Sequence, residues 1–196
     1  MTRMAKTRRG ATRDQRQRRR SNYAWHRRIP WVAVGALAVV LIAGVLIARQ
    51  LGIGESAGRY VPGGGVGEHL AVGQPIAYTS SPPTSGTHWV SPATWGYHNE
   101  PVEDASAVHN MEHGGVVASY NNIPAADLAA LRDLLTTYPR DRYREVKLLI
   151  RPYSKIAPGT IVLTAWNWID ELPRYDEARV RTFMDAHLNK CCENVP

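Results

Sequence analysis

One long run without formal charge, early in the chain, constrains the organisation of the whole protein. Residues 29–48 contain no Asp, Glu, Lys or Arg, and a helix needs about 20 mostly apolar residues to cross a lipid bilayer. Pro30 stands in the first turn, where a missing N–H does little harm, and Trp25 and Trp31 flank the start as interfacial aromatic residues do. No cleavage site of small residues follows Ala48. We therefore expect an uncleaved signal anchor with one transmembrane helix over residues 29–48.

The charges on the two sides of this run are unequal. Residues 1–28 hold 11 basic residues against a single acidic one, Asp14, whereas the chain from Arg49 onward has 13 basic and 16 acidic residues. The net charge of +7 therefore resides in the N-terminal tail. Because basic residues mark the cytoplasmic side of a membrane helix, residues 1–28 are predicted to lie in the cytoplasm against anionic lipid headgroups. No nucleic-acid partner is expected, and the C-terminal part is expected outside.

Composition divides the rest of the chain into a tether and one domain. Residues 49–68 are rich in glycine, as flexible linkers are, and residues 69–196 are long enough to bury one core. The first part of this domain, residues 69–110, mixes Pro, Ser, Thr and Gly without an apolar period. This composition predicts a long ordered loop rather than helices, with one short strand over residues 74–79.

Regular elements are predicted only after the double glycine at 114–115. Short β-branched runs predict strands, and apolar residues at a 3.6-residue spacing predict helices. The order β-α-β-β-α therefore predicts an α+β domain with a short sheet and two helices. The expected elements are strand 116–120, helix 124–138, strands 146–150 and 160–166, and helix 176–188.

Histidines gather in one part of this domain and suggest a metal site. Four of the seven histidines lie between His88 and His113, and neutral imidazole is the commonest protein ligand of transition metals. His109 and His113 are four residues apart with Glu112 between them, so a helix would place all three on one face. The candidate ligands are His88, His109, His113 and Glu112, with His98 or His69 as further choices for the fourth position.

The backbone conformation of this motif decides which metal it suits, and copper and zinc both stay open. A helical turn gives a mixed nitrogen and oxygen set that suits zinc. An extended strand would place Met111 on one face with His109 and His113, and a thioether favours Cu(I). The glycines at 114–115 favour a single helical turn that ends there. The alternative to a metal is a structural network of hydrogen-bonded His and Glu side chains beneath the long loop.

Enzyme chemistry is disfavoured by what surrounds these residues. The letters H-x-x-E-H of residues 109–113 match an inverted zinc-peptidase motif, but that motif needs a longer helix than one that stops at Gly114. Ser85 with His88 or His109 would make a nucleophile and its base, yet no acid partner follows from the spacing. We therefore assign no catalytic residue.

Two adjacent cysteines, Cys191 and Cys192, stand near the end of the sequence. Disulfides are allowed outside the cytoplasm, so redox chemistry or cross-linking is one interpretation. A soft-metal site with His187 is a second, and an incidental pair is the third.

Two motifs carry a resemblance to a known family. Residues 82–88 read PPTSGTH, and residues 109–116 read HNMEHGGV. With these motifs, the chain over about residues 68–189 resembles domain-of-unknown-function family 3105. Members of that family are typically bacterial membrane-anchored proteins, so the resemblance implies a membrane anchor here, whereas it implies no chemistry.

The sequence as a whole favours a membrane-anchored extracytoplasmic domain of a bacterial cell. Its expected role is non-catalytic binding of copper or zinc through the histidine cluster. The alternative is an envelope protein-interaction or assembly module, with a membrane or envelope protein as partner, in which the His and Glu residues are purely structural.

Overall fold

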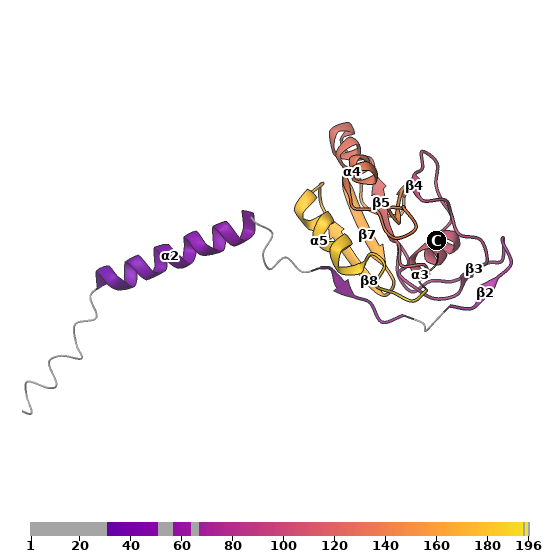
Figure 1. Cartoon of the computed structure of the whole chain (residues 1–196), viewed down its shortest axis with the longest axis horizontal. Coiled ribbons are helices and arrows are strands. Elements are labelled where there is room, and N and C mark those ends of the chain that lie inside the picture. Colours follow the sequence, from indigo (N-terminus) through magenta and orange to yellow (C-terminus); the bar gives the residue numbers. More distant parts are fainter. Residues whose placement is uncertain (1–30, 51–56, 64–66, 194, 196) are drawn as a thin grey trace, which may run out of the picture. The chain divides into compact units, whose positions relative to one another are not determined.

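The computed structural model places two separate units along the chain (Figure 1). The first unit covers Met1–Gln50 and the second covers Leu51–Pro196. The structure describes residues 31–50, 57–63, 67–193 and 195.

The first unit contains one helix, α2, over Trp31–Gln50. The predicted cytoplasmic tail, residues 1–28, and the first two residues of the predicted span lie outside the described residues. Among the described residues, no helix combines the length and the apolar character that crossing a bilayer requires. The transmembrane helix therefore stays a prediction from the sequence.

The second unit is built on a six-stranded mixed sheet in the order β1-β8-β7-β5-β6-β4. The central strand β5 runs parallel to β6 and antiparallel to β7. Parallel neighbours need a crossover connection, and helix α4, Ala125–Thr137, provides it between β5 and β6. The strands are β1 Arg59–Tyr60, β4 Gly96–Tyr97, β5 Val116–Asn121, β6 Leu148–Pro152, β7 Thr160–Ala165 and β8 Trp168–Leu172.

Side chains of the strands alternate between two layers of the domain because successive residues point to opposite faces of a sheet. Val116 and Ala118 pack into the larger core with α4 and with α5, Glu177–His187. Val117 packs on the opposite face, against helix α3, Asp104–Glu112. Figure 1 shows α4 and α5 on one side of β5 and β7, and α3 with β2 and β3 on the other side.

A second, two-stranded sheet covers α3. Strand β2, His69–Leu70, runs parallel to β3, His88–Trp89. Their register places His69 directly opposite His88. Two histidines that are 19 positions apart in the sequence are thus brought to one place by backbone pairing.

The predicted α+β class is confirmed, and several elements are found where the apolar pattern indicated. Strand 116–120 is β5, helix 124–138 is α4, strand 160–166 is β7 and helix 176–188 is α5. Strand 146–150 is shifted: β6 begins at Leu148 and continues through Pro152. The apolar face expected for α5 is buried through Val180, Phe183, Met184 and Leu188.

Other expectations were wrong. No strand is present over 74–79, and residues 69–110 do not stay irregular, because α3 begins at Asp104. The predicted order also lacks β8, which follows a turn at Asn167, where φ is +65°. Within the predicted tether, Arg59–Tyr60 pairs with β8.

Candidate metal centre

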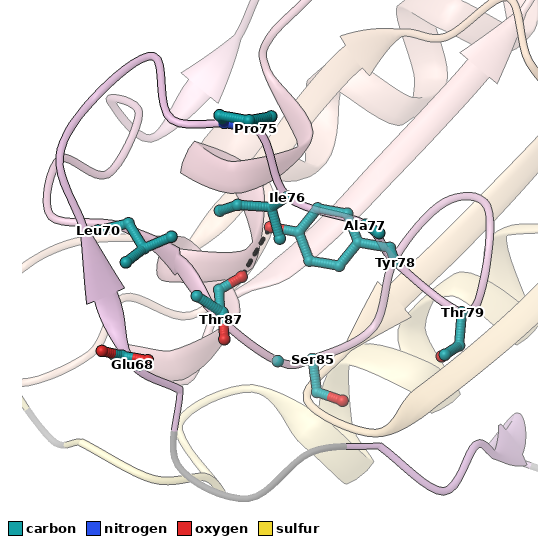
Figure 2. A pocket seen from close by; sticks show the side chains of 10 residues that line it. Glu68, Leu70, Pro75, Ile76, Ala77, Tyr78, Thr79, Ser85 and Thr87 are labelled. Carbon is teal, nitrogen blue, oxygen red and sulfur yellow. Dashed lines mark hydrogen bonds between the residues drawn. The ribbon is translucent and has the colours of Figure 1, made fainter.

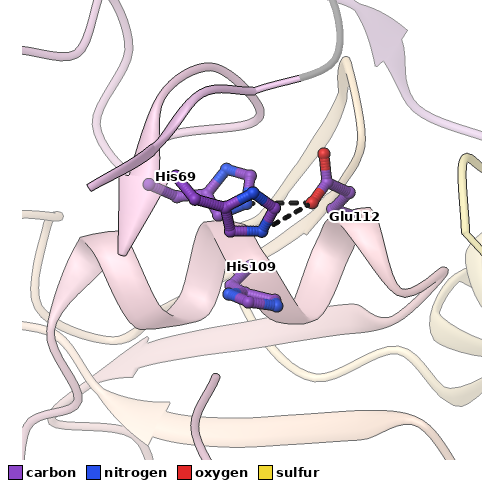
Figure 3. A group of neighbouring side chains, drawn as sticks. His69, His109 and Glu112 are labelled. Atoms are coloured by element: carbon purple, nitrogen blue, oxygen red, sulfur yellow. Dashed lines mark ion pairs between the residues drawn. The ribbon is translucent and has the colours of Figure 1, made fainter. Parts of the chain in front are cut away.

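Four side chains from three elements meet between the small sheet and α3. Strand β2 provides His69, β3 provides His88, and α3 provides His109 and Glu112. One nitrogen or oxygen atom from each lies within 4.8 Å of the other three. Figure 3 shows His69 and Glu112 close together at α3, with His109 on the same helix as Glu112. We call these four residues the histidine–glutamate cluster.

His88 and Glu112 form the buried centre of the cluster. Both side chains are 0% exposed, and His88 Nε2 lies 2.9 Å from Glu112 Oε2. His88 Nδ1 is 2.8 Å from the carbonyl oxygen of Gly86. Since a carbonyl only accepts hydrogen bonds, Nδ1 must carry the proton, and the Nε2 of the neutral ring has only a lone pair.

His88 Nε2 and Glu112 Oε2 thus lie 2.9 Å apart in the interior, and the Nδ1 proton of His88 is already donated to Gly86. Neither His88 Nε2 nor Glu112 Oε2 has a hydrogen-bond partner within the described part of the chain. Buried polar atoms are rarely left in this state, because an unsatisfied polar atom costs about 1–3 kcal/mol. A cation between them, either a proton or a metal ion, removes the conflict.

His109 repeats the arrangement of His88. Its Nδ1 donates to the carbonyl oxygen of Trp89 at 2.6 Å, which leaves Nε2 with the lone pair. Burial lowers the pKa of His109, and the neighbouring imidazoles lower it further. The ring is therefore neutral near pH 7, which is the form that coordinates metals.

His69 completes the cluster from its exposed side. Its Nε2 lies 3.5 Å from Glu112 Oε2, and its side chain is 40% exposed. The other carboxylate oxygen, Glu112 Oε1, accepts the N–H of Gly67 at 3.3 Å. A Cβ at position 67 would lie 2.4 Å from His88 Nδ1, so only glycine lets the chain pass this close to the ring.

A buried ion pair fixes the start of the helix that carries His109 and Glu112. Arg151 of β6 is 1% exposed, and its guanidinium contacts the Asp104 carboxylate at 2.8 Å. The same guanidinium donates to the Val102 carbonyl and to the Ser119 hydroxyl. The first turn of α3 is thereby tied to two strands of the sheet.

Asn110 holds the loop that lies beside the cluster. Its side chain is fully buried and makes two hydrogen bonds with the backbone of Ala93, one in each direction. The backbone carbonyl oxygen of Asn110 accepts the N–H of Gly115. A Cβ at Gly115 would lie 2.4 Å from the Trp95 ring, so glycine lets this loop pack closely. The Asn and second Gly of the HNMEHGG motif are thus structural.

The structure brings together most of the predicted ligands, but not all of them. His88, His109 and Glu112 lie in the cluster, and His69 fills the fourth place. His113 contacts His109, with 3.0 Å between the two Nε2 atoms, but it is outside the group of four. His98 is elsewhere: its Nε2 donates to the Thr94 carbonyl.

The copper interpretation built on Met111 was wrong. It required residues 109–113 to be extended, whereas α3 is helical through Glu112. Met111 is therefore turned away from His109 and is 1% exposed in the apolar cluster with Ala107 and Val117.

A surface cavity lies beside the small sheet, and it contains Ser85 (Figure 2). The cavity measures about 510 Å³ and is lined by side chains that include Leu70, Tyr78 and Thr87. Leu70 follows His69 in β2 and Thr87 directly precedes His88 of β3, so both side chains point to the side opposite the histidines. Ser85 thus belongs to this cavity, whereas His88 belongs to the cluster.

The cysteine pair is not part of a metal site with His187. Cys191 and Cys192 form a disulfide between adjacent residues. His187 Nε2 instead donates to the Ala57 carbonyl, and its ring packs against Trp168. Burial lowers the pKa of His187.

The fold and the cluster define a small α+β domain in which two buried histidines and a buried glutamate meet a third histidine, His69, that is partly exposed. A family model described as "Protein of unknown function (DUF3105)" matches residues 69–194, and the chain belongs to that family. No curated protein and no solved structure matches the chain. The matched segment begins at His69 and contains the whole cluster.

Proposed function

We propose that the domain binds one transition-metal ion, preferably zinc, through the histidine–glutamate cluster, in a non-catalytic role. The buried contact of His88 Nε2 with Glu112 Oε2 carries this proposal, because the two atoms lie 2.9 Å apart without a hydrogen bond and a metal ion bound by both would satisfy them. Four protein donors also fill the tetrahedral set of a closed zinc site.

The donor chemistry supports zinc over Cu(I). The cluster offers imidazole nitrogens and one carboxylate oxygen, a combination found at zinc sites, and Met111 brings no sulfur to it. Metal-bound histidines usually donate their second ring N–H to a carbonyl or carboxylate, which fixes the ring. His88 and His109 both do so, toward Gly86 and Trp89.

Metal content after reconstitution tests the proposal. The full chain, purified without a histidine tag and incubated with zinc, is expected to retain about one equivalent by elemental mass spectrometry. His88→Ala should retain none, because it removes a buried ligand, and His98→Ala should match the wild type. Wild-type protein that takes up neither zinc nor copper would instead support a structural ion pair of His88 with Glu112, in an envelope interaction or assembly module.

We also propose that this domain is anchored to a membrane and works outside the cytoplasm. The support is the uncharged run over residues 29–48 and the basic tail before it. The chain should stay in the membrane pellet during alkaline carbonate extraction, and external protease should degrade the domain in spheroplasts. Recovery of the chain in the carbonate supernatant would contradict the anchor.

A further inference from the structure

A second set of donor atoms lies on the outer side of His109. His113 Nε2 is 3.0 Å from His109 Nε2, and Glu193 Oε2 is 3.7 Å from the same atom of His113. Zinc bonds of about 2.0–2.1 Å in a tetrahedral arrangement place neighbouring donor atoms about 3.3 Å apart. The two separations lie on either side of that distance, so His113 can share an ion with His109 and can share one with Glu193. We call His113 and Glu193 the outer pair.

The C-terminal segment holds the outer pair in place through the backbone. The N–H of Glu193 donates to the carbonyl of Glu112 at 3.0 Å, and the N–H of Asn189 donates to the carbonyl of Gly114 at 2.7 Å. The buried amine of Lys147 donates to the carbonyls of both His113 and Val195. Three contacts therefore join residues 189–195 to Glu112 at the end of α3, to Gly114 and to Lys147, which directly precedes β6.

Exposure rises steadily from the cluster to the outer pair. The side chains of His88 and Glu112 are 0% exposed, that of His113 is 15% exposed and that of Glu193 is 45% exposed. His109 lies between the two groups and is buried. The donors thus form a graded path from solvent to the buried centre.

His109 cannot serve both groups at once. Its Nδ1–H is held by the Trp89 carbonyl, so Nε2 offers its single lone pair to one ion at a time. The cluster and the outer pair are therefore alternative positions for the same ion. An ion can pass from one to the other while it stays bound to His109.

We propose that His113 and Glu193, together with His109, form a transit site through which the metal ion reaches and leaves the histidine–glutamate cluster. This inference rests on the proposed metal-binding function. The ion exchanges its ligands one by one along the path, so it is never stripped of all of them in the low-dielectric interior.

The rate of zinc transfer tests the transit site. Zinc-loaded full chain is mixed with excess of the chromogenic chelator 4-(2-pyridylazo)resorcinol in a stopped-flow instrument, and apo protein is mixed with zinc in the reverse experiment. His113→Ala and Glu193→Gln are each expected to slow release and uptake by about tenfold, which corresponds to about 1.4 kcal/mol of activation free energy. Because release and uptake slow by the same factor, the affinity for zinc and the amount of zinc bound stay unchanged. His98→Ala should transfer zinc at the wild-type rate.

Three outcomes would overturn the proposal. Unchanged rates in both variants would make His69, which is 40% exposed, the route to the site. Loss of bound zinc in His113→Ala would make His113 a ligand of the buried ion. Wild-type protein that binds no zinc would overturn the proposed function together with this inference. Glu193→Gln changes a half-exposed side chain, so it tests the path even when His113→Ala fails to fold.

Discussion

Glu112→Gln is expected to stabilise the metal-free protein while it abolishes metal uptake. The amide of glutamine has the shape of the carboxylate and presents an N–H group toward His88 Nε2, 2.9 Å away. That N–H group can donate to His88 Nε2, and the amide oxygen can still accept the N–H of Gly67. Relief of two unsatisfied buried atoms should raise the free energy of unfolding by about 1–3 kcal/mol.

Urea unfolding with a strong chelator present, at about pH 8, measures this effect. Glu112→Ala is the matched control: it also removes the ligand, but it offers no N–H group and leaves a cavity, so it should destabilise the protein. A loss of about 3–5 kcal/mol in Glu112→Gln would contradict the account, because such a loss is expected when a buried ion pair is broken.

Arg151→Met is expected to destabilise the domain by about 3–5 kcal/mol, because it strands the partly buried carboxylate of Asp104 without its main partner. The loss also releases the carbonyl of Val102 and the first turn of α3. Since α3 carries two members of the cluster, zinc affinity should fall together with stability. Urea unfolding and a competitive zinc titration measure the two effects.

The neighbouring lysine provides a matched control for this ion pair. Lys155 contacts the same carboxylate of Asp104 at 3.0 Å, but its side chain is 65% exposed. Exposed pairs contribute about 0–1 kcal/mol, so Lys155→Ala should change stability by less than about 1 kcal/mol. The double change Arg151→Met with Asp104→Leu should recover part of the loss. Equal losses in Arg151→Met and Lys155→Ala would contradict the anchoring role of Arg151.

The elements that the sequence predicted correctly are those whose buried residues follow a regular spacing within the element itself. α4 and α5 each repeat apolar residues at a helical spacing, and β5 and β7 are short β-branched runs. The length of helix α3 was underestimated, because most of its buried residues are small or polar and show no apolar spacing. The paired strands β1 to β4 have two residues each, which is too short for a period to appear.

The sequence predicted those ligands of the site that lie within one of its two short motifs. His109 and Glu112 follow from the i, i+3 geometry of one helix, and His88 from a second motif nearby. His69 could not be placed from spacing, because only the parallel pairing of β2 with β3 sets it opposite His88. The roles of Asn110 and Arg151 were missed for the same reason: their partners are distant in the sequence.

X-ray absorption at the zinc edge of the reconstituted full chain tests the central claim most directly, because it reports the atoms bound to the ion. We expect a first shell of nitrogen and oxygen donors at about 2.0–2.1 Å, with the outer-ring scattering of three imidazoles and no sulfur at about 2.3 Å. His98→Ala should give the same spectrum. A sulfur shell, or a shell of water oxygens without imidazole scattering, would contradict the histidine–glutamate cluster as the metal site.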